Sequence, residues 1–473
     1  MEEKKKKLSL LLACLPIIVV IFMGLMSVVK WKAAMHTPLL ASIIVAAIIG
    51  KYSGFSWDEM EKGLVEGVSR ALPALFILLI VGSIIGSWIA GGIIPTLIYY
   101  GLKLISPKVL IPATAFVTAI VSLSTGTSFT SLATVGLALM ATGVSMGFPA
   151  PLVAGAVISG AYFGDKLSPL SDTTNLAPAM SGCTLFEHVG HMLWDTIPAF
   201  LGSLILYYFI GLKHASSSMT QPEQIQGIYD GLEKAFNINP LLLIVPIITI
   251  ILAVKKVPAI PALVSVSVLG GLCAMIFQGA DIGAVLRATT FGFKSDTGIK
   301  MVDSLLSRGG ITSMGGTIML LTLATALGGI LEKVGSLEVL LNSIMSKVRS
   351  TGQLMLATLF SGLAIAFATG AQLLAIIIPA RMFAPAFIER NLHPKNLSRA
   401  AEAAGTVGIN LVPWSVPAIF AHNILGVEPA QFIPYLFFAY FVILANAIYG
   451  YTGISITKIS NDVSKQTDTN LNV

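Results

Sequence analysis

Charged residues are scarce in this chain of 473 residues: they make up 11% of it, whereas soluble proteins average roughly 25%. This deficit excludes an ordinary soluble domain. A hydrophobic content of 55% and a mean hydropathy of +0.85 instead indicate a polytopic membrane protein. Several apolar runs approach the ~20 residues that cross a bilayer. These runs are 8–29, 38–50, 71–90, 189–211, 240–254, 258–278, 313–331 and 431–457.

Cysteine is also rare. Cys14, Cys183 and Cys273 are odd in number, lie in apolar segments and lack metal-ligand spacing. This excludes a disulfide framework, and we expect the three to behave as small buried hydrophobes. The sequence also shows neither a nucleophile–base pair nor a metal set of the kind that an enzyme would use. We therefore expect no enzymatic activity and no cofactor.

The basic residues form no continuous face, so the net charge of +6 does not indicate a nucleic-acid partner. It is better explained by anionic lipid and by positive residues on the cytoplasmic side of a plasma membrane of bacterial type. Lys4–Lys7 precede the first apolar run, and no small-residue cleavage site follows it. We expect a retained first span with the N-terminus in the cytoplasm. The C-terminal tail, residues 459–473, is expected on the same side.

Residues recur in order at an interval of 244 positions, which predicts two related halves. Thr125-Gly126 matches Thr369-Gly370, and Gly164, Pro169, Ser171 and Gly182 match Gly408, Pro413, Ser415 and Gly426. The end of the run 240–254 at Lys255-Lys256 fits an inverted second half. The predicted units are repeat 1 (1–213), an external linker (214–238) and repeat 2 (239–458).

Each half is expected to contain the same series of segments. Two spans are followed by an amphipathic interfacial segment (53–70; 281–310), a third span and a short helix of about a dozen residues. Next comes a re-entrant hairpin (108–147; 351–392), whose arms are short for crossing a bilayer. A broken helix (149–180; 397–425) and a closing span complete the half. The predicted fold is therefore all-α, with two inverted repeats, about ten full spans and two hairpins.

The hairpin tips carry polar side chains at a depth where such groups are costly. The first tip holds Ser124, Thr125, Gly126, Thr127 and Ser128, and the second holds Thr369, Gly370 and Gln372. Hard cations such as Na⁺ favour oxygen ligands, and broken helix ends add free carbonyls. These residues are candidate ligands, although Ser and Thr can also bond to helix carbonyls or pack between helices.

The most polar stretch is Gly164–Asn175, which interrupts the first broken helix and carries three charges. Irregular polar backbone survives at membrane depth only where it lines a cavity or is buried in protein. Two carboxylates and one amine make a net negative site that Na⁺ or a proton could neutralise. An ion pair between the lysine and one of these aspartates is the structural alternative. The candidates are Asp165, Lys166, Ser171, Asp172, Thr173, Thr174 and Asn175, with Na⁺ held by Asp172, Thr125 and Thr127.

The matching stretch of the second half has lost all three charges. It offers neutral candidates, Asn410 and Ser415, while Glu402, His422 and Asn423 are secondary candidates. Other charges are expected at the membrane interface rather than in the site. They are Glu187 and Asp195 with the neighbouring His188 and His191, and Arg381, Glu389, Arg390 and Arg399.

The segment 160–178, GAYFGDKLSPLSDTTNLAP, resembles the signature of NhaC-type Na⁺/H⁺ antiporters. The span pattern extends this resemblance over nearly the whole chain. It implies the inverted-repeat fold of the ion-transporter superfamily, a homodimer and an elevator-like movement of a transport domain. It also implies Na⁺ and protons as the transported species. The family includes malate–lactate antiporters, so exchange of a small carboxylate coupled to Na⁺ and H⁺ is the alternative.

An ion channel is the competing class of protein. A channel needs a continuous polar path with few tightly binding groups. Two broken helices at one depth are instead typical of alternating access. The sequence therefore predicts a secondary active transporter that exchanges Na⁺ for H⁺.

Overall fold

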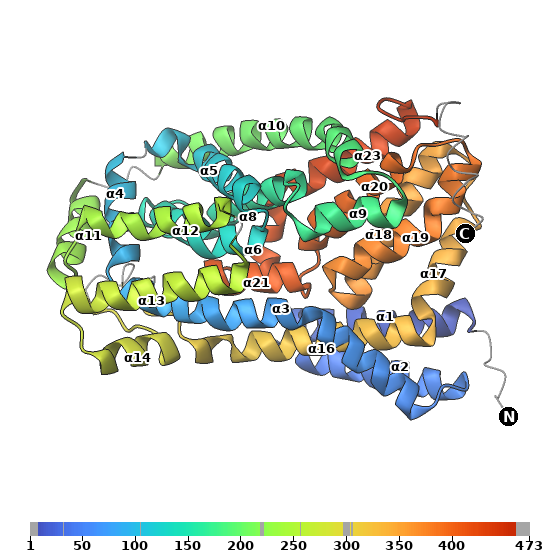
Figure 1. Ribbon diagram of the computed structural model, residues 1–473, viewed down its shortest axis with the longest axis horizontal. Coiled ribbons are helices and arrows are strands. Elements are labelled where there is room, and N and C mark those ends of the chain that lie inside the picture. The colour runs from blue at the N-terminus through green and yellow to red at the C-terminus, as the bar shows by residue number, and fades with distance from the viewer. Residues whose placement is uncertain are drawn as a thin grey trace.

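The computed structural model describes residues 8–31, 33–104, 106–217, 222–255, 257–296, 303 and 306–459, and these residues form an elongated bundle of helices (Figure 1). Within them, extended backbone pairs only at a single bridge between Leu392 and Lys458. The lysine cluster at 4–7 and residues 460–473 of the expected tail lie outside the described residues. An all-α protein is confirmed.

The first part of the chain contains ten α-helices and three short π or 3₁₀ turns within the described residues. They are α1 (Leu10–Leu25), η1 (Met26–Lys30), α2 (His36–Tyr52), α3 (Trp57–Ala90), α4 (Ile93–Leu104), η2 (Pro107–Val109), α5 (Leu110–Thr125), α6 (Ser128–Ser131), η3 (Leu132–Gly136), α7 (Leu137–Ser145), α8 (Ala150–Leu167), α9 (Asp172–Ser181) and α10 (Leu185–Ser217).

The second part follows with a similar series. Its elements are α11 (Pro222–Ala235), η4 (Pro240–Leu243), α12 (Ile244–Val254), α13 (Ala259–Gln278), α14 (Ile282–Phe291), η5 (Ile311–Met314), α16 (Gly315–Val334), α17 (Ser336–Met345), α18 (Thr351–Thr369), α19 (Gln372–Glu389), α20 (Pro394–Glu402), η6 (Ala403–Val407), η7 (Gly408–Leu411), α21 (Val416–Leu425), α22 (Pro429–Phe432), η8 (Ile433–Tyr435) and α23 (Phe437–Thr452).

Eight helices of the described chain are long and apolar enough to cross a membrane, and the number reaches 11 if each of three bent helix pairs is one span. One bent pair, Pro394–Leu411 with Val416–Leu425, turns by 46° within the predicted broken helix 397–425. A polytopic membrane protein is thereby confirmed.

Helix bounds recur at the interval that the sequence motifs follow. The segments Pro107–Thr125 and Ser128–Ser145 recur, 244 residues later, as Thr351–Thr369 and Gln372–Glu389. The helices α8 and α9 likewise recur as Pro394–Leu411 and α21. The two tips end their first arms in the same way, because Gly126 and Gly370 both adopt positive φ, of 69° and 62°.

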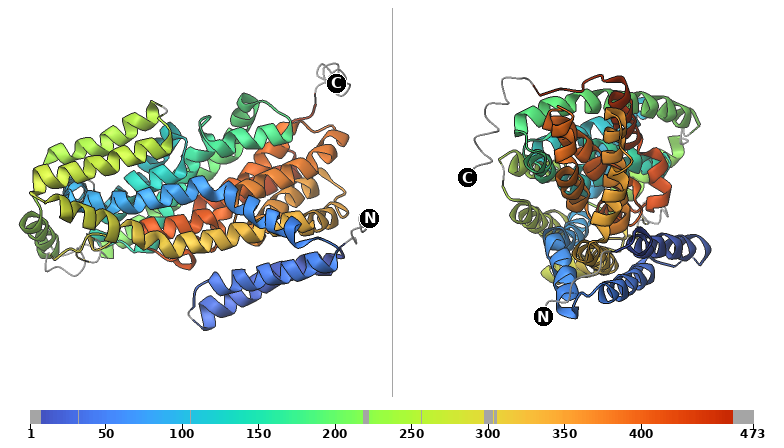
Figure 2. Two further views of the ribbon diagram at one scale, coloured as in Figure 1. Left: turned by 60° about the horizontal axis from the view of Figure 1, so that its bottom comes forward. Right: turned by 90° about the vertical axis from the view of Figure 1, so that its right-hand side faces the viewer.

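The interfacial segment expected at 53–70 is wrong as a separate element, because α3 runs without a break from Trp57 to Ala90. Ser56 and Glu59 form a capping box that starts the helix. Glycines then bring α3 against α16: a Cβ on Gly67 would lie 2.2 Å from the Thr325 carbonyl oxygen. In Figure 2, α1 and α2 stand out from the body as a pair beside this layer.

A second set of glycine contacts brings α5 against α8. A Cβ on Gly160 of α8 would lie 2.1 Å from the carbonyl oxygen of Ala115 in α5, and one on Gly164 would lie 2.4 Å from that of Ala119. Small residues let two backbones approach closely. This contact places the end of α8 directly beside the tip that follows α5.

Candidate functional site

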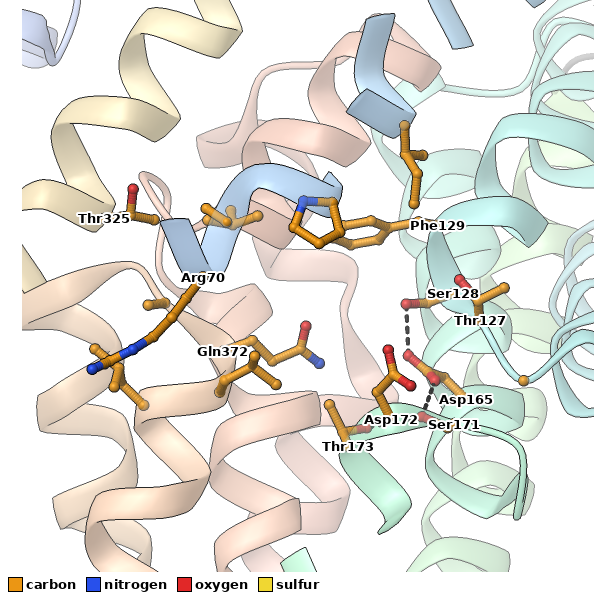
Figure 3. Close-up of a pocket in the computed structure, with 18 of the residues that line it drawn as sticks. Arg70, Thr127, Ser128, Phe129, Asp165, Ser171, Asp172, Thr173, Thr325 and Gln372 are labelled. Carbon is orange, nitrogen blue, oxygen red and sulfur yellow. Dashed lines mark hydrogen bonds between the residues drawn. The ribbon is translucent and has the colours of Figure 1, made fainter. Parts of the chain in front are cut away.

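Both hairpin tips and both helix breaks border one cavity of about 250 Å³ (Figure 3). The tip after α5 contributes Thr127 and Ser128, and the tip before α19 contributes Gln372. The remaining wall comes from α3 and α16. The other lining residues are Gly67, Arg70, Ala71, Pro73, Ile77, Gly126, Phe129, Asp165, Ser171, Asp172, Thr173, Thr325, Ala371, Leu373, Leu374 and Val416. The cavity therefore joins segments that lie some 350 residues apart in the chain.

Asp165 lies in the last turn of α8 and is 5% exposed. The Ser128 hydroxyl, from the first tip, donates to its Oδ2 at 2.7 Å. The Ser171 hydroxyl, from the helix break, donates to its Oδ1 at 2.6 Å. Hydrogen bonds from two hydroxyls stabilise the charged form of a buried carboxyl group. Asp165 thus ties the tip to the break while facing the cavity.

Asp172 is the first residue of α9 and is exposed to the cavity. A carboxylate at a helix N-terminus is stabilised by the helix dipole. Among the described residues, no hydrogen bond or ion pair to its carboxylate is formed. Figure 3 shows this carboxylate between the amide of Gln372 and the pair formed by Asp165 and Ser171.

Two carboxylates in one small cavity repel each other, so the site favours a species that carries positive charge. Carboxylate, hydroxyl and amide oxygens are the ligands that hard cations prefer. The described residues contain no group of three or more His, Cys, Asp or Glu side chains arranged to hold a metal. The two carboxylates and the neighbouring hydroxyl and amide oxygens therefore form a candidate site for a small cation.

The structure brings seven of the predicted candidates to the cavity wall, and the others do not line it. The seven are Thr127, Ser128, Asp165, Ser171, Asp172, Thr173 and Gln372. Most of the other candidates form hydrogen bonds with backbone atoms. Ser124, Thr125, Thr174, Asn175, Thr369, Asn410 and Asn423 donate to carbonyl oxygens, Ser415 caps α21, and His422 Nδ1 lies 3.1 Å from the Val427 carbonyl oxygen.

Lys166 pairs with neither aspartate of its own loop, so the structural alternative of an ion pair within the loop is wrong. Its Nζ lies 3.0 and 3.1 Å from the two carboxylate oxygens of Asp195 and donates to the Thr196 hydroxyl at 2.8 Å. Successive residues of a helix point about 100° apart, so Lys166 faces α10 while Asp165 faces the cavity. Both side chains of the pair are fully buried.

The prediction that Asp195 and Arg399 face the lipid headgroups is wrong, because both side chains are fully buried in the protein. They are bridged by Asn446 of α23, which donates to Asp195 at 2.6 Å and accepts from Arg399 Nε at 3.0 Å. Arg399 also donates to the Ser455 hydroxyl at 2.7 Å. Asn446 could not be identified from the sequence, since nothing near it in its apolar run indicates a polar partner.

Arg70 and Phe129 also line the cavity, although the sequence did not point to either as a site residue. Arg70 forms an ion pair with Glu332 of α16, and both side chains are partly exposed. Phe129 stacks on Phe420 of α21 with ring centroids 4.2 Å apart. The match of Ser69-Arg70 to Ser307-Arg308 in the other half is the signal that could have drawn attention to Arg70.

Comparison with known proteins gives concordant results. The model of the Na⁺/H⁺ antiporter family matches residues 160–454. The Na(+)/H(+) antiporter NhaC of Alkalihalophilus pseudofirmus is 36% identical, over 98% of this chain and 100% of that protein. The malate-2H(+)/Na(+)-lactate antiporter of Bacillus subtilis is 35% identical, over 95% and 97%. The arginine/ornithine antiporter ArcD of Halobacterium salinarum is 34% identical, over 95% and 93%.

Proposed function

Because this chain belongs to the Na⁺/H⁺ antiporter family, we propose that it exchanges Na⁺ for H⁺ across the membrane that it spans. The observation that carries this proposal is the pair of carboxylates, Asp165 and Asp172, in one cavity bordered by both hairpin tips. The resemblance of residues 160–178 to NhaC-type antiporters is confirmed by the relatives. The ions that those relatives exchange are the ions we assign here.

In the proposed site, Asp172 and Asp165 supply the negative charge that attracts Na⁺. Hydroxyls on the cavity wall, among them that of Thr127 in the first tip, supply neutral oxygen ligands. Thr125 was a predicted ligand, but its hydroxyl bonds to the Thr127 carbonyl and lies near the Ser131 hydroxyl, so we assign it to the shape of the tip. Protonation of a carboxylate weakens its hold on Na⁺, and this competition couples the two ions.

Alternating access is the proposed means of release. The constant interval of 244 residues between matching helices supports two repeats, and we propose that they are inverted, with re-entrant hairpins. The tips then meet near the middle of the bilayer, and the hairpins with the broken helices move against α3 and α16. We further propose a homodimer in a bacterial-type plasma membrane, with the N-terminus and the C-terminus in the cytoplasm.

A carboxylate exchanger coupled to Na⁺ and H⁺ is the second candidate. Arg70 is the observation that favours it, since a guanidinium on the cavity wall can hold a carboxylate. Its ion pair with Glu332 already satisfies that charge, however. Simple Na⁺/H⁺ exchange therefore fits the described cavity better.

The test is Na⁺-driven proton flux into proteoliposomes that contain the purified protein. We expect a Na⁺ gradient to move protons in the opposite direction, and Asp172→Asn to abolish this flux. Glu338→Gln, an exposed change of the same kind on α17, is the matched control and should leave the flux intact. Dissipation of the Na⁺ gradient without proton movement would indicate a channel. Uptake of labelled malate or lactate would favour the second candidate.

A further inference from the structure

A third buried carboxyl group, Glu402, lies behind the cavity wall and has no part in the site described above. It ends α20 in a run of alanines and is fully buried. The Thr406 hydroxyl donates to its Oε1 at 2.8 Å. Its Oε2 has no hydrogen-bond partner, which is costly for a charged oxygen in a protein interior. A protonated carboxyl group removes most of that cost.

The buried charges around Glu402 leave one negative charge in excess. Lys166 and Arg399 are the two cations of this region, and Asp165, Asp195 and Glu402 are its three carboxyl groups. Asp195 is matched by Lys166 and, through Asn446, by Arg399. One bound proton brings the group to neutrality, and the carboxyl group with a free oxygen is the natural place for it.

Two hydroxyls connect Glu402 with the cation site. The Glu402 carboxyl group lies beside the Thr173 side chain, which lines the cavity. The hydroxyls of Thr173 and Ser171 are 3.0 Å apart, and Ser171 donates to Asp165 at 2.6 Å. Ser171 donates its only hydroxyl proton to Asp165. In the hydrogen bond between the Thr173 and Ser171 hydroxyls, Thr173 must therefore be the donor. The Thr173 oxygen can then only accept, so Glu402 can join this chain only as a donor, in its protonated form.

We propose that Glu402 carries the exchanged proton, while Asp165 and Asp172 hold Na⁺, and that the hydroxyls of Thr173 and Ser171 relay the proton between them. When Na⁺ binds at Asp165 and Asp172, the Glu402 proton moves to Thr173, the Thr173 proton to Ser171 and the Ser171 proton to Asp165, which passes a proton to water in the cavity. Each O–H bond that breaks is replaced by one that forms, so one proton leaves for each Na⁺ that enters, and the steps reverse when Na⁺ leaves. This inference rests on the proposed Na⁺/H⁺ exchange and assigns the proton and Na⁺ to different carboxyl groups.

The other titratable groups near Glu402 are less suited to this role. Lys166 is fixed by three contacts, and Arg399, one turn before Glu402 on α20, stays charged. The helices packed against α20 present Asp172 from α9, which faces the cavity, and Arg381 from α19, which is exposed. The helix α10 contributes Asp195, which is already paired with Lys166, and two histidines. One of them, His188, is hydrogen-bonded to Ser398, and the other is His191.

Glu402→Gln tests the proposal, because the amide keeps the shape and the donor of a protonated carboxyl group but cannot release the proton. Two fluxes are measured in proteoliposomes: Na⁺-driven proton flux, and exchange of radiolabelled Na⁺ for unlabelled Na⁺. We expect the proton flux to fall to the background of protein-free liposomes while Na⁺/Na⁺ exchange is retained. Glu402→Asp should restore part of the proton flux, and Glu389→Gln, an exposed change of the same kind, should alter neither flux.

The outcomes separate this proposal from the function on which it rests. If wild-type protein moves no protons in response to Na⁺, the proposed function fails. If it does, and Glu402→Gln still moves protons at the wild-type rate, only the assignment of Glu402 is overturned. Should Glu402→Gln not fold, Thr173→Val replaces it, with Thr173→Ser as the variant that keeps the hydroxyl. Loss of proton flux in Thr173→Val but not in Thr173→Ser, with Na⁺/Na⁺ exchange retained in both, supports the relay. Equal proton fluxes in the two variants overturn it.

Discussion

The buried ion pair between Lys166 and Asp195 should make the bundle sensitive to the loss of either partner, and Asp195→Asn tests this. The change removes one charge and leaves the lysine buried without a counter-ion. At a separation of 3.0 Å and an effective dielectric constant of about 20, the attraction between the two charges is about 5 kcal/mol. Removal of one partner of a buried pair costs about 3–5 kcal/mol. We expect a loss of that size in the free energy of unfolding.

The double variant Lys166→Met, Asp195→Leu isolates the charge from the packing. Replacement of both partners by apolar residues of similar volume leaves no buried charge without a partner, so most of the lost stability should return. The assay is unfolding by SDS titration in mixed micelles, applied to the wild type, both single variants and the double variant. The difference between the double variant and the sum of the single variants gives the coupling free energy.

A loss of less than about 1 kcal/mol for Asp195→Asn would refute the reasoning, since exposed pairs give values of that size. A double variant as unstable as the two single variants combined would also refute it. Such additivity would mean that the two side chains act on stability independently, in conflict with the contact between them.

Three further changes probe the cavity and its supports. Gly160→Ala should prevent folding or abolish transport, because its Cβ would lie 2.1 Å from the Ala115 carbonyl oxygen; yield and monodispersity after purification measure this. Ser128→Ala should weaken Na⁺ binding about tenfold, the value of one hydrogen bond to the charged Asp165, as measured by the Na⁺ concentration for half-maximal flux. Glu332→Gln should change the unfolding free energy by less than about 1 kcal/mol, since its ion pair is partly exposed.

Local patterns in the sequence were enough to predict where most of the helices around the site begin and end. Runs of apolar residues set the spans, and Gly126 and Gly370, which end helices at positive φ, mark the tips. The broken helices follow from Pro169 and Pro413, each of which lies in an interval between two helices. Such signals are local, because each depends on the conformation of a few neighbouring residues.

The partners of the buried charges could not be predicted, because they depend on how helices pack. Lys166 and Asp195 are 29 residues apart, and Asp195 and Asn446 are 251 apart. Adjacent charges in the sequence suggested that Lys166 would pair within its own loop. The turn of the helix instead directs Lys166 and Asp165 to different sides. Burial of Arg399 escaped prediction for the same reason, since its partners lie on α23 and beyond it.

The asymmetry between the two halves follows from what a cation site can tolerate. The stretch with Asp165 and Asp172 supplies two negative charges, and charges at the matching positions of the second half would add to their repulsion. That half instead contributes backbone and neutral groups, with Gln372 on the wall and Ser415 capping α21. Glu402, the one buried acid among the described residues of that half, lies behind the wall, where a proton rather than Na⁺ can neutralise it. In the mechanism that we propose, these separate positions for Na⁺ and the proton let one cavity exchange the two cations.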